Sequence, residues 1–379
     1  MKHKIMRVST VPLSLDKLLN GQLRMLAQHY DVVAVSSPGA ELDEVGRREG
    51  VRTEAVPMER RLAPFKDLVS LCKLIRLIRK EKPQLVHSLT PKAGLLTMLA
   101  AWICRVPVRI HTFTGLVFPT STGLTRRLLM TTDRITCACA TYVNPEGEGV
   151  KNDLLKHGIT RKPLHIIGNG NINGVDLSYY DRTPEVMTAA LPYRGENRFT
   201  FCFVGRMVRD KGVEELVLAF TRLRQVYPKI RLLLVGPFED QLDPVSERTR
   251  KNILTDEGIT FLGWQDDIRP FLAASDVFVF PSYREGFPNV VLQAGALGLP
   301  CIVTNINGCN EIIRDGQNGV IIEPRSVEQL YRAMQRMVEH PLEVERMAIR
   351  AREWISRRYS REALWNDLLR VYQSLLPDS

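Results

Sequence analysis

The stretch that decides the fold is FTFCFVGRMVRDKGVEELVLAFTRLRQVYPKIRLLLV, residues 199–235. Residues 199–204 form an apolar run that favours a buried strand, and the polar, glycine-containing run 205–212 favours a loop. The next segment predicts a helix, because apolar residues recur in it at spacings of three, four and seven. These residues are Val213, Leu216, Val217, Phe220 and Leu223. A second apolar run, 230–235, returns as a strand, so the stretch predicts a strand–helix–strand unit in a parallel sheet.

The same alternation of strands and helices extends along most of the chain. Further strands are expected at Lys4–Ser9, Asp31–Ser36, Leu85–Leu89, Val106–Phe113, Leu164–Ile167, Asp276–Phe280 and Pro300–Asn305. Helices are expected at Leu15–His29, Lys66–Lys80, Gly94–Cys104, Val290–Leu297 and Trp354–Leu376. The glycine- and asparagine-rich run 168–174 interrupts this pattern and predicts a loop or hinge. Since 379 residues exceed one ordinary domain, we predict two doubly wound α/β domains, residues 1–177 and 178–359.

Composition narrows the class of protein. The chain is 44% hydrophobic and 25% charged, which is typical of a globular protein, and no apolar run approaches the roughly 18 residues of a spanning helix. The first residues lack the apolar core of a signal peptide. Seven cysteines without a CxxC pair fit a reducing compartment better than a disulfide framework. We therefore expect a cytoplasmic protein.

The positive charge is confined to one half of the chain. Residues 1–190 hold 27 Lys and Arg against 17 Asp and Glu, whereas residues 191–379 hold 25 of each. The net charge of +10 therefore belongs to the first half alone. Such an excess indicates an anionic partner, which could be nucleic acid, an acidic membrane or a phosphorylated ligand.

Two loops of the second half carry residues suited to an anionic sugar ligand. Gly205-Arg206 and Lys211-Gly212 lie between a strand and a helix, where glycines, helix N–H groups and two cations favour a diphosphate. The run 281–289 also follows a predicted strand, and its Glu285 can accept hydrogen bonds from sugar hydroxyls. Each loop alone could equally be a solvated surface loop, with Glu285 compensating a helix dipole.

Together, Gly205-Arg206, Lys211-Gly212 and Glu285-Gly286-Phe287-Pro288 resemble the motifs of the family 4 retaining glycosyltransferases. Leu262-Gly263-Trp264 and 307–319 follow in the family's order, and 87–94 and 168–176 resemble its bacterial capsular and lipid-linked oligosaccharide subgroup. The resemblance implies the GT-B fold, in which two Rossmann-like domains face a central cleft. It also implies an N-terminal acceptor domain, on which residues 360–379 pack back, and a C-terminal nucleotide-sugar domain.

The resemblance assigns roles to individual residues. Arg206 and Lys211 would hold the donor diphosphate, and Glu285 would hold the transferred sugar. These three residues form the expected catalytic set. A glutamate is expected eight positions after Glu285 on the ribose hydroxyls, but this chain has Gln293, which loses a charge-assisted hydrogen bond. The full donor-binding set is Gly205, Trp264, Gly286, Phe287, Pro288, Asn289 and Gln293.

The resemblance also names residues of the first half, with two departures from the family pattern. The glycine pair expected after the first strand is reduced to Gly21, and Thr114 stands where many members have a histidine. His111 lies three residues earlier on the opposite strand face, so we expect it to be packed. The acceptor or cleft set is Thr114, Gly115, Gly21 and Lys92.

The implied chemistry needs no resident cofactor. The sequence has no DxD pair, so we expect no metal; cations and helix N–H groups would neutralise the leaving nucleoside diphosphate. The resemblance further implies no protein nucleophile, with the leaving phosphate receiving the acceptor proton. The donor would be a nucleotide sugar; the resemblance does not choose uracil over guanine, and we expect a UDP-linked donor.

The segment 66–80 predicts a basic amphipathic helix. It could cover the sheet with a solvated cationic face, or lie on an acidic membrane through Arg60, Arg61, Arg76 and Lys80. The resemblance favours the membrane, with a polyprenyl-diphosphate-linked acceptor at the inner face of the plasma membrane. Nucleic acid is disfavoured, since no groove-binding module is present. A transferase acting on a small soluble acceptor and a non-catalytic nucleotide-sugar-binding protein remain the alternatives.

Overall fold

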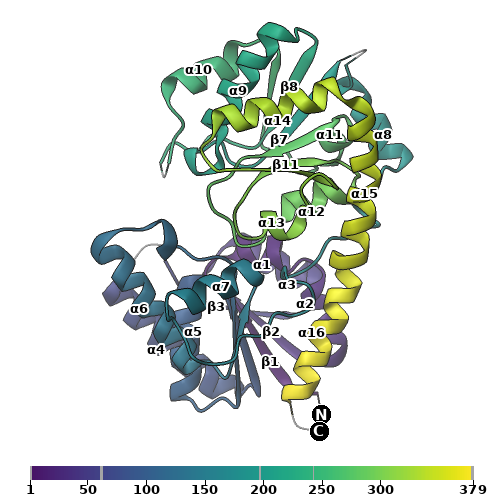
Figure 1. Ribbon diagram of the computed structural model, residues 1–379. Helices are drawn as coiled ribbons and strands as arrows, with labels where there is room; N and C mark the ends of the chain where they lie inside the picture. Colours follow the sequence, from purple (N-terminus) through teal and green to yellow (C-terminus); the bar gives the residue numbers. More distant parts are fainter. Residues whose placement is uncertain (1, 60–62, 196–197, 242, 377–379) are drawn as a thin grey trace. The chain divides into compact units, whose positions relative to one another are not determined.

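The chain folds into two α/β units in the computed structural model, which describes residues 2–59, 63–195, 198–241 and 243–376 (Figure 1). Unit 1 comprises Met1–Asn173 and Glu362–Ser379, and unit 2 comprises Gly174–Arg361. The chain passes from one unit to the other within the run 168–174 and again after α15. The boundaries drawn from the sequence, after residues 177 and 359, lie within a few residues of these positions.

Unit 1 is built on a parallel six-stranded sheet with the order β3-β2-β1-β4-β5-β6. Ile5 of β1 is paired with Val32 of β2 on one side and with Leu85 of β4 on the other. The strands are β1 (Lys4–Val8), β2 (Asp31–Ser36), β3 (Arg52–Ala55), β4 (Leu85–Leu89), β5 (Val108–Phe113) and β6 (Tyr142–Pro145). Because strand order reverses between β1 and β4, this is the doubly wound Rossmann arrangement.

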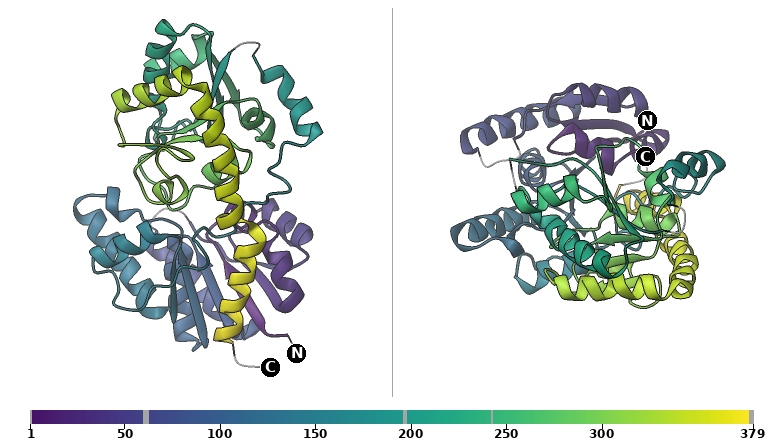
Figure 2. Two further views of the ribbon diagram at one scale, coloured as in Figure 1. Left: turned by 45° about the vertical axis from the view of Figure 1, so that its right-hand side comes forward. Right: turned by 90° about the horizontal axis from the view of Figure 1, so that it is seen from above.

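Helices cover both faces of the unit 1 sheet. The neighbouring residues Ile5 and Met6 point into different apolar clusters, as the alternation of a strand requires. The cluster of Met6 includes α4 (Pro64–Glu81), α5 (Pro91–Ile103), α6 (Gly123–Cys139) and α7 (Glu148–Lys156). The cluster of Ile5 includes α1 (Pro12–Leu18), α2 (Gln22–His29), α3 (Ala40–Glu49) and α16 (Arg361–Leu375). Figure 2 shows α16, in yellow, along the unit 1 sheet.

Unit 2 repeats the same topology, with the sheet order β12-β11-β10-β7-β8-β9. The strands are β7 (Phe199–Val204), β8 (Ile230–Val235), β9 (Ile259–Gly263), β10 (Val277–Phe280), β11 (Cys301–Thr304) and β12 (Gly319–Ile322). The helices are α8 (Pro184–Ala190), α9 (Val213–Val226), α10 (Glu247–Thr255), α11 (Arg269–Ala273), α12 (Asn289–Ala296), α13 (Cys309–Ile312), α14 (Val327–Glu339) and α15 (Pro341–Tyr359). Short 3₁₀ turns lie at Leu191–Tyr193 and Arg209–Lys211 in this unit, and at Phe118–Thr120 in unit 1. The strand–helix–strand unit predicted for residues 199–235 is confirmed by β7, α9 and β8.

Three expectations about secondary structure are wrong, each for a local reason. Residues 164–167 form no strand; Leu164 makes a single bridge to Val143, and the Ile167 N–H donates instead to the Asn144 side chain. The helix expected at 15–29 is two helices, because Gly21 takes φ 77° between them. The helix expected at 354–376 ends at Tyr359, and the next residue bridges to Val175 before α16 starts.

A buried polar chain ties α16 to the unit 1 sheet. Arg7 of β1 donates to the Tyr372 hydroxyl at 2.7 Å, and this hydroxyl lies 2.7 Å from His87 Nδ1 of β4. His87 Nε2 in turn lies 2.6 Å from the Thr112 hydroxyl of β5. Unlike the apolar contacts around it, this chain fixes the position of α16 along the strands, because its hydrogen bonds need particular geometry.

His111 is packed in the interior of unit 1, as expected from its strand position. Its side chain is 1% exposed, and its Nδ1 lies 2.9 Å from the Ser88 hydroxyl. Burial lowers the pKa of His111 to about 3, and burial together with the nearby Arg7 charge holds the pKa of His87 well below its usual value. Both imidazoles are therefore neutral in the folded chain at pH 7.

We expect unit 1 to lose stability as the pH falls below about 6.5, where the unfolded chain gains protons that folded His87 and His111 do not. The free energy of unfolding should fall by up to about 1.4 kcal/mol per pH unit for each histidine, down to the folded pKa. Melting temperatures between pH 7 and 5 should show a shallower pH slope for His111→Asn than for the wild type. The control His29→Asn, at an exposed position of α2, should keep the wild-type slope. Equal slopes for wild type and His111→Asn would contradict the assignment.

Candidate functional site

The two motifs of the second half lie on either side of the point where strand order reverses in unit 2. β7 and β10 are neighbours in the sheet, and their connections leave in opposite directions. The loop after β7 is residues 205–212, and the loop after β10 is residues 281–288. In open α/β sheets this position, at the carboxyl ends of the strands, is where ligands bind. The structure thus brings together two segments that are far apart in the sequence.

Glycines allow these loops to touch. Gly212 has φ 69°, and a Cβ built on it would lie 2.1 Å from the Pro281 carbonyl oxygen. Gly308, in the loop after β11, has φ 74°, and its Cβ would lie 2.4 Å from the Gly286 carbonyl oxygen. No side chain fits at either distance, so the backbones of three successive loops pack directly on one another.

Lys211 and Glu285 meet where the two loops join. The Lys211 ammonium forms an ion pair with the Glu285 carboxylate, and the Ser282 hydroxyl donates to the same carboxylate at 2.7 Å. The ammonium also lies 5.2 Å from the centre of the Phe280 ring. Both charged side chains are mostly shielded from solvent, with exposed fractions of 20% and 16%. A cation and a carboxylate are therefore held side by side at the switch point.

Arg206 is held by a residue that the sequence did not single out. Its guanidinium forms an ion pair with Glu239, which follows β8, while half of the Arg206 side chain remains exposed. Glu239 gives no signal in the sequence, because it belongs to no motif and reaches Arg206 only through the pairing of β7 with β8. An incoming anion would compete with this carboxylate for the arginine.

Further polar contacts brace the loop after β10 against the loop after β7 and the start of α9. Arg284 forms an ion pair with Asp210 at 3.1 Å, and the Tyr283 hydroxyl donates to Glu215 at 2.5 Å. Burial and the Glu215 carboxylate raise the pKa of Tyr283, so it remains a donor at neutral pH. These four residues also escaped the sequence analysis, because their roles depend on contacts between loops.

Helix α12 begins directly after the second loop, at Asn289. The positive end of the helix dipole lies there, and the Val291 N–H already donates to the Pro288 carbonyl at 3.1 Å. Phe287, just before the helix, is buried, and its ring lies 5.5 Å from the ring of Tyr359. This contact anchors the loop in the apolar core of unit 2. The loop and helix start therefore place the positive end of the α12 dipole in the segment that follows Glu285.

The remaining predicted donor residues lie on neighbouring elements. Gln293 is four residues after Asn289 on α12, so both lie on the same helix face. Trp264 follows β9, is 59% exposed, and donates its indole N–H to Asp266 at 3.1 Å. In the part of the chain that the structure describes, Trp264 makes no hydrogen bond or ion pair with the two central loops, so its role stays a prediction.

The residues predicted in the first half lie in several places of unit 1. Gly21 precedes α2, and its N–H donates to Glu49 at 3.0 Å. Thr114 and Gly115 follow β5 directly. Lys92 was expected in a loop but lies in the first turn of α5, where its ammonium is 2.5 Å from Asp67 and is 9% exposed.

The switch point of unit 1 is formed by two threonines, to neither of which the sequence analysis assigned a role. Thr10 follows β1 and Thr90 follows β4, and their hydroxyls lie 2.7 Å apart. Thr90 has φ 66°, an uncommon conformation for a residue with a β-branched side chain. The sequence signal available was the position of Thr90, between an apolar strand and the Pro91 that starts a helix.

Of the predicted membrane-facing residues, Arg60 and Arg61 lie outside the described residues. Arg76 and Lys80 are exposed in the second half of α4, and the Lys80 ammonium lies 3.3 Å from Glu54. Among the described helices, none is long and apolar enough to cross a membrane. Within the same ranges no group of three or more His, Cys, Asp or Glu side chains could hold a metal ion.

Two family models match the chain, one in each unit. The model described as glycosyl transferase 4-like domain matches residues 19–170, and the model described as glycosyl transferases group 1 matches residues 198–340. The capsular polysaccharide biosynthesis glycosyltransferase CapM of Staphylococcus aureus is 30% identical over 379 residues, which cover 100% of this chain and 98% of CapM. A UDP-Gal:alpha-D-GlcNAc-diphosphoundecaprenol alpha-1,3-galactosyltransferase of Escherichia coli is 28% identical, with 89% of this chain and 90% of the relative covered.

Solved structures share the fold over nearly the whole chain. Alr3699/HepE of Anabaena in complex with UDP gives a TM-score of 0.82 at 18% identity, covering 98% of this chain and 100% of that one. A glycosyltransferase of Rickettsia africae ESF-5 gives a TM-score of 0.79 at 20% identity, with 100% of both chains covered. At these identities the likeness speaks for the fold, which agrees with the two Rossmann-like sheets.

Replacing Gly212 by alanine should destabilise unit 2 far more than the same change at Gly316. Both glycines have a positive φ, 69° and 71°, but only the Gly212 Cβ would strike a neighbouring backbone; nothing lies within 4 Å of the Gly316 Cβ. The conformational cost is about 1–2 kcal/mol at either position, and the clash adds about 1–3 kcal/mol at Gly212. Thermal unfolding of the two variants measures the difference. Equal losses would show that the loops do not pack this closely.

Proposed function

The chain belongs to the GT-B glycosyltransferases of family 4, and on that premise we propose a specific reaction. It transfers a sugar, with retention at the anomeric carbon, from a UDP-linked donor to a polyprenyl-diphosphate-linked saccharide in bacterial surface-glycan synthesis. The observation that carries the proposal is the meeting of the Lys211 and Glu285 loops at the unit 2 switch point.

The donor diphosphate would take over the cations of this site. Arg206 and Lys211 now pair with Glu239 and Glu285, so both have a negative partner before any ligand is present. A diphosphate beside the start of α12 would accept hydrogen bonds from both cations and from the helix N–H groups. Glu285, released from Lys211, would then be available to accept hydrogen bonds from the hydroxyls of the donor sugar.

The ribose contact would differ from the family pattern. Gln293, on the same face of α12 as Asn289, would donate and accept hydrogen bonds with the two ribose hydroxyls. Its neutral amide gives a weaker bond than the expected glutamate. The exposed Trp264 loop after β9 would lie toward the base.

The chemical step would rest on charge neutralisation. The bond between the anomeric carbon and the diphosphate oxygen breaks, and the acceptor hydroxyl oxygen forms its bond on the same face of the sugar. The acceptor proton passes to the leaving phosphate. Arg206, Lys211 and the helix N–H groups stabilise the negative charge that develops on the diphosphate, which is the largest contribution that such a site makes to the rate.

The choice of acceptor rests on two relatives. The Escherichia coli relative is named for a diphosphoundecaprenol-linked acceptor, and the Staphylococcus aureus relative for capsular polysaccharide biosynthesis. In unit 1, Thr114, Gly115, Gly21 and Lys92 would contact the acceptor. The Lys92 ammonium would have to leave Asp67 to meet the acceptor diphosphate.

A lipid-linked acceptor requires contact with a membrane, and unit 1 has an apolar surface suited to it. We call the side chains Phe65, Leu68, Val69, Leu124 and Leu128 the α4–α6 patch. Phe65 is 89% and Leu124 is 82% exposed, and both belong to the first turn of their helix. The helices of a parallel sheet start at the same edge, so the two ends of the patch share it.

Cations lie close in sequence to the apolar residues of the α4–α6 patch on both helices, a combination that favours acidic membranes. Lys66, Arg126 and Arg127 lie within or next to it on the same two helices. Arg76 and Lys80 lie eleven residues or more beyond Phe65 along α4, about 17 Å or further. We therefore propose that the α4–α6 patch inserts into the membrane. Arg76 and Lys80 would contribute only long-range electrostatic attraction to acidic lipids.

Substitution of the two cations tests the donor site. Arg206→Gln and Lys211→Gln should each lower kcat about 100-fold or more, because each removes a group that stabilises the leaving diphosphate. The assay follows radiolabelled sugar from UDP-sugars into a polyprenyl-diphosphate saccharide. Lys229→Gln, an exposed cation before β8, is the control and should keep wild-type activity.

Three outcomes of this assay would contradict the proposal. Transfer to soluble saccharides alone would favour the small-acceptor transferase. Donor binding without transfer to any acceptor would favour the non-catalytic binding protein. Wild-type rates in both variants would remove Arg206 and Lys211 from the site.

The membrane assignment predicts different effects for apolar and cationic substitutions. Phe65→Ser with Leu124→Ser should abolish most sedimentation with phosphatidylglycerol vesicles, since about 25 cal/mol is lost for each Å² of apolar surface no longer buried in the membrane. Arg76→Gln with Lys80→Gln should weaken binding only at low salt, where exposed charges act over about 10 Å or more. Transfer to a soluble acceptor analogue checks that each variant is folded. Unchanged sedimentation of the apolar variant would contradict the assignment.

A further inference from the structure

The two protein partners of the Glu285 carboxylate bind the same oxygen atom. The Lys211 ammonium and the Ser282 hydroxyl both donate to Oε1, the hydroxyl at a distance of 2.7 Å. Within the described residues, Oε2 makes no hydrogen bond and no ion pair. Because the side chain is 16% exposed, the carboxylate is held at one oxygen and keeps the other for a ligand.

The Ser282 hydroxyl has one proton and three acceptor oxygens around it. Its Oγ lies 3.2 Å from the Asp210 carbonyl oxygen and 3.3 Å from the Arg284 carbonyl oxygen, but only 2.7 Å from the Glu285 carboxylate. A carboxylate is the strongest acceptor of the three, and this distance is typical of a charge-assisted hydrogen bond. Ser282 is fully buried, so solvent does not compete for the proton. The hydroxyl therefore donates to Glu285.

Other contacts hold the Ser282 backbone in place without help from its hydroxyl. Its carbonyl accepts a hydrogen bond from the Thr304 hydroxyl, at the end of β11. The N–H of the next residue, Tyr283, donates to the Asp210 carbonyl at 2.8 Å. The loop after β10 is thereby tied to both neighbouring strands of the sheet. Removal of the hydroxyl alone should leave the path of the loop unchanged.

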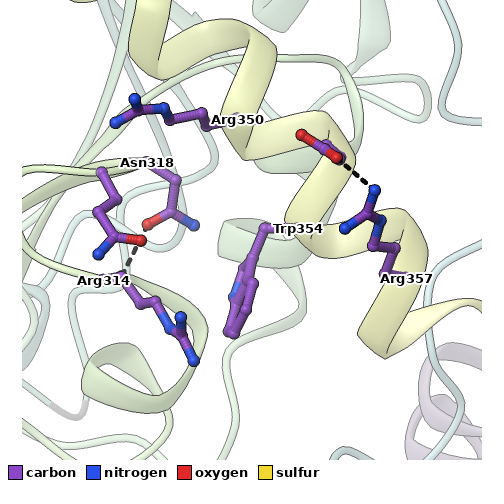
Figure 3. Close-up of a pocket in the computed structure, with 7 residues that line it drawn as sticks. Arg314, Asn318, Arg350, Trp354 and Arg357 are labelled. Carbon is purple, nitrogen blue, oxygen red and sulfur yellow. Dashed lines mark hydrogen bonds and ion pairs between the residues drawn. The ribbon is translucent and has the colours of Figure 1, made fainter.

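Helix α15 supports the far end of the same loop. Its last residue, Tyr359, packs on Phe287 and donates its hydroxyl to the Glu311 carbonyl at 3.0 Å. Figure 3 shows Trp354 of this helix beside Arg314, whose guanidinium lies 3.9 Å from the centre of the indole ring. These contacts fix α15 against α13 and the turn that follows it. The end of the loop is therefore also held independently of the serine hydroxyl.

Binding of the donor would change which group holds Glu285. In the proposed reaction the diphosphate draws the Lys211 ammonium away from the carboxylate. Ser282 is then the one remaining partner of Oε1 among the described residues. A glutamate side chain without a partner has considerable rotamer freedom, and fixing it at the moment of reaction costs entropy. A hydroxyl that already holds the carboxylate avoids that cost.

We propose that Ser282 is a positioning residue for Glu285, an inference that rests on the proposed function. Its hydroxyl holds Oε1 after Lys211 has moved to the diphosphate. Oε2 then accepts a hydrogen bond from a hydroxyl of the donor sugar. Prior orientation of the carboxylate lowers the barrier to transfer, because the sugar is held in one geometry. Ser282 itself contacts neither the sugar nor the diphosphate.

Replacement of Ser282 by alanine separates the sugar contact from the diphosphate contact. Ser282→Ala should lower kcat/KM about tenfold or more for the UDP-sugar that the wild type transfers, because Glu285 loses a charge-assisted hydrogen bond. UDP carries the diphosphate but no sugar. Its dissociation constant, measured by calorimetry, should therefore stay within about twofold of the wild-type value. A merely structural role of the serine would weaken both.

Ser275→Ala is the matched control. Ser275 is also buried in unit 2, but it lies before β10, and its hydroxyl donates to the Phe271 carbonyl at 2.7 Å. This variant should keep both the wild-type kcat/KM and the wild-type affinity for UDP. Ser282→Cys places a weaker donor in a side chain of similar size, so its kcat/KM should lie between those of Ser282→Ala and the wild type. If the alanine variant does not fold, the cysteine variant carries the same comparison.

The outcomes separate this inference from the proposed function. Wild-type kcat/KM in Ser282→Ala, while Lys211→Gln loses activity, would overturn the role of Ser282 and leave the function standing. A parallel loss of kcat/KM and UDP affinity would also overturn it, because the loop would then need the hydroxyl for its shape. Absence of transfer from every UDP-sugar by the wild type would overturn the function, and the role of Ser282 with it.

Discussion

The packing of the loop after β7 on the loop after β10 is the constraint on which the rest of the site depends. Gly212 lies against the Pro281 carbonyl, and this contact places the Lys211 ammonium beside the Glu285 carboxylate. The contact exists because β7 and β10 are neighbours where the strand order reverses. A sheet order without β7 beside β10 would separate the two motifs, which together form the donor site that we propose.

The two halves of the chain differ in net charge, and the difference matches the donor site and the membrane surface that we propose. The half from residue 191 onward is neutral overall, and the donor site that we propose there has two cations that are each matched by a glutamate. A site of this kind needs placed charges more than a net excess, because a ligand exchanges one negative partner for another. The first 190 residues carry the whole net charge of +10. Most of them belong to unit 1, which also has the exposed apolar side chains of the α4–α6 patch. That combination suits an acidic membrane surface.

Most of the fold could be predicted from local sequence patterns. The strand at 199–204 and the helix face of Val213 and Leu216 follow from apolar spacing alone, because burial dictates both. The breaks at Gly21 and after Tyr359 could not be predicted, since each depends on a distant partner or on one residue's φ. The edge strands β3, β6 and β12 were also missed; β3, for example, is polar and partly exposed and lacks the apolar run that revealed the equally short β10.

The residues of the candidate site also fall into two groups: those that local sequence patterns reveal and those that only the fold brings together. Arg206, Lys211 and Glu285 could be named because glycines and cations after strands form a recognisable pattern. Glu239, Asp210 and the Thr10–Thr90 pair could not, because their contacts arise from strand pairing between distant segments.

A crystal structure of the full-length protein with UDP tests the central claim most directly. The account predicts that the diphosphate lies within hydrogen-bond distance of Arg206, Lys211 and the first N–H groups of α12, with both glutamate ion pairs broken. UDP bound elsewhere, or bound with the Lys211–Glu285 pair intact, would contradict it.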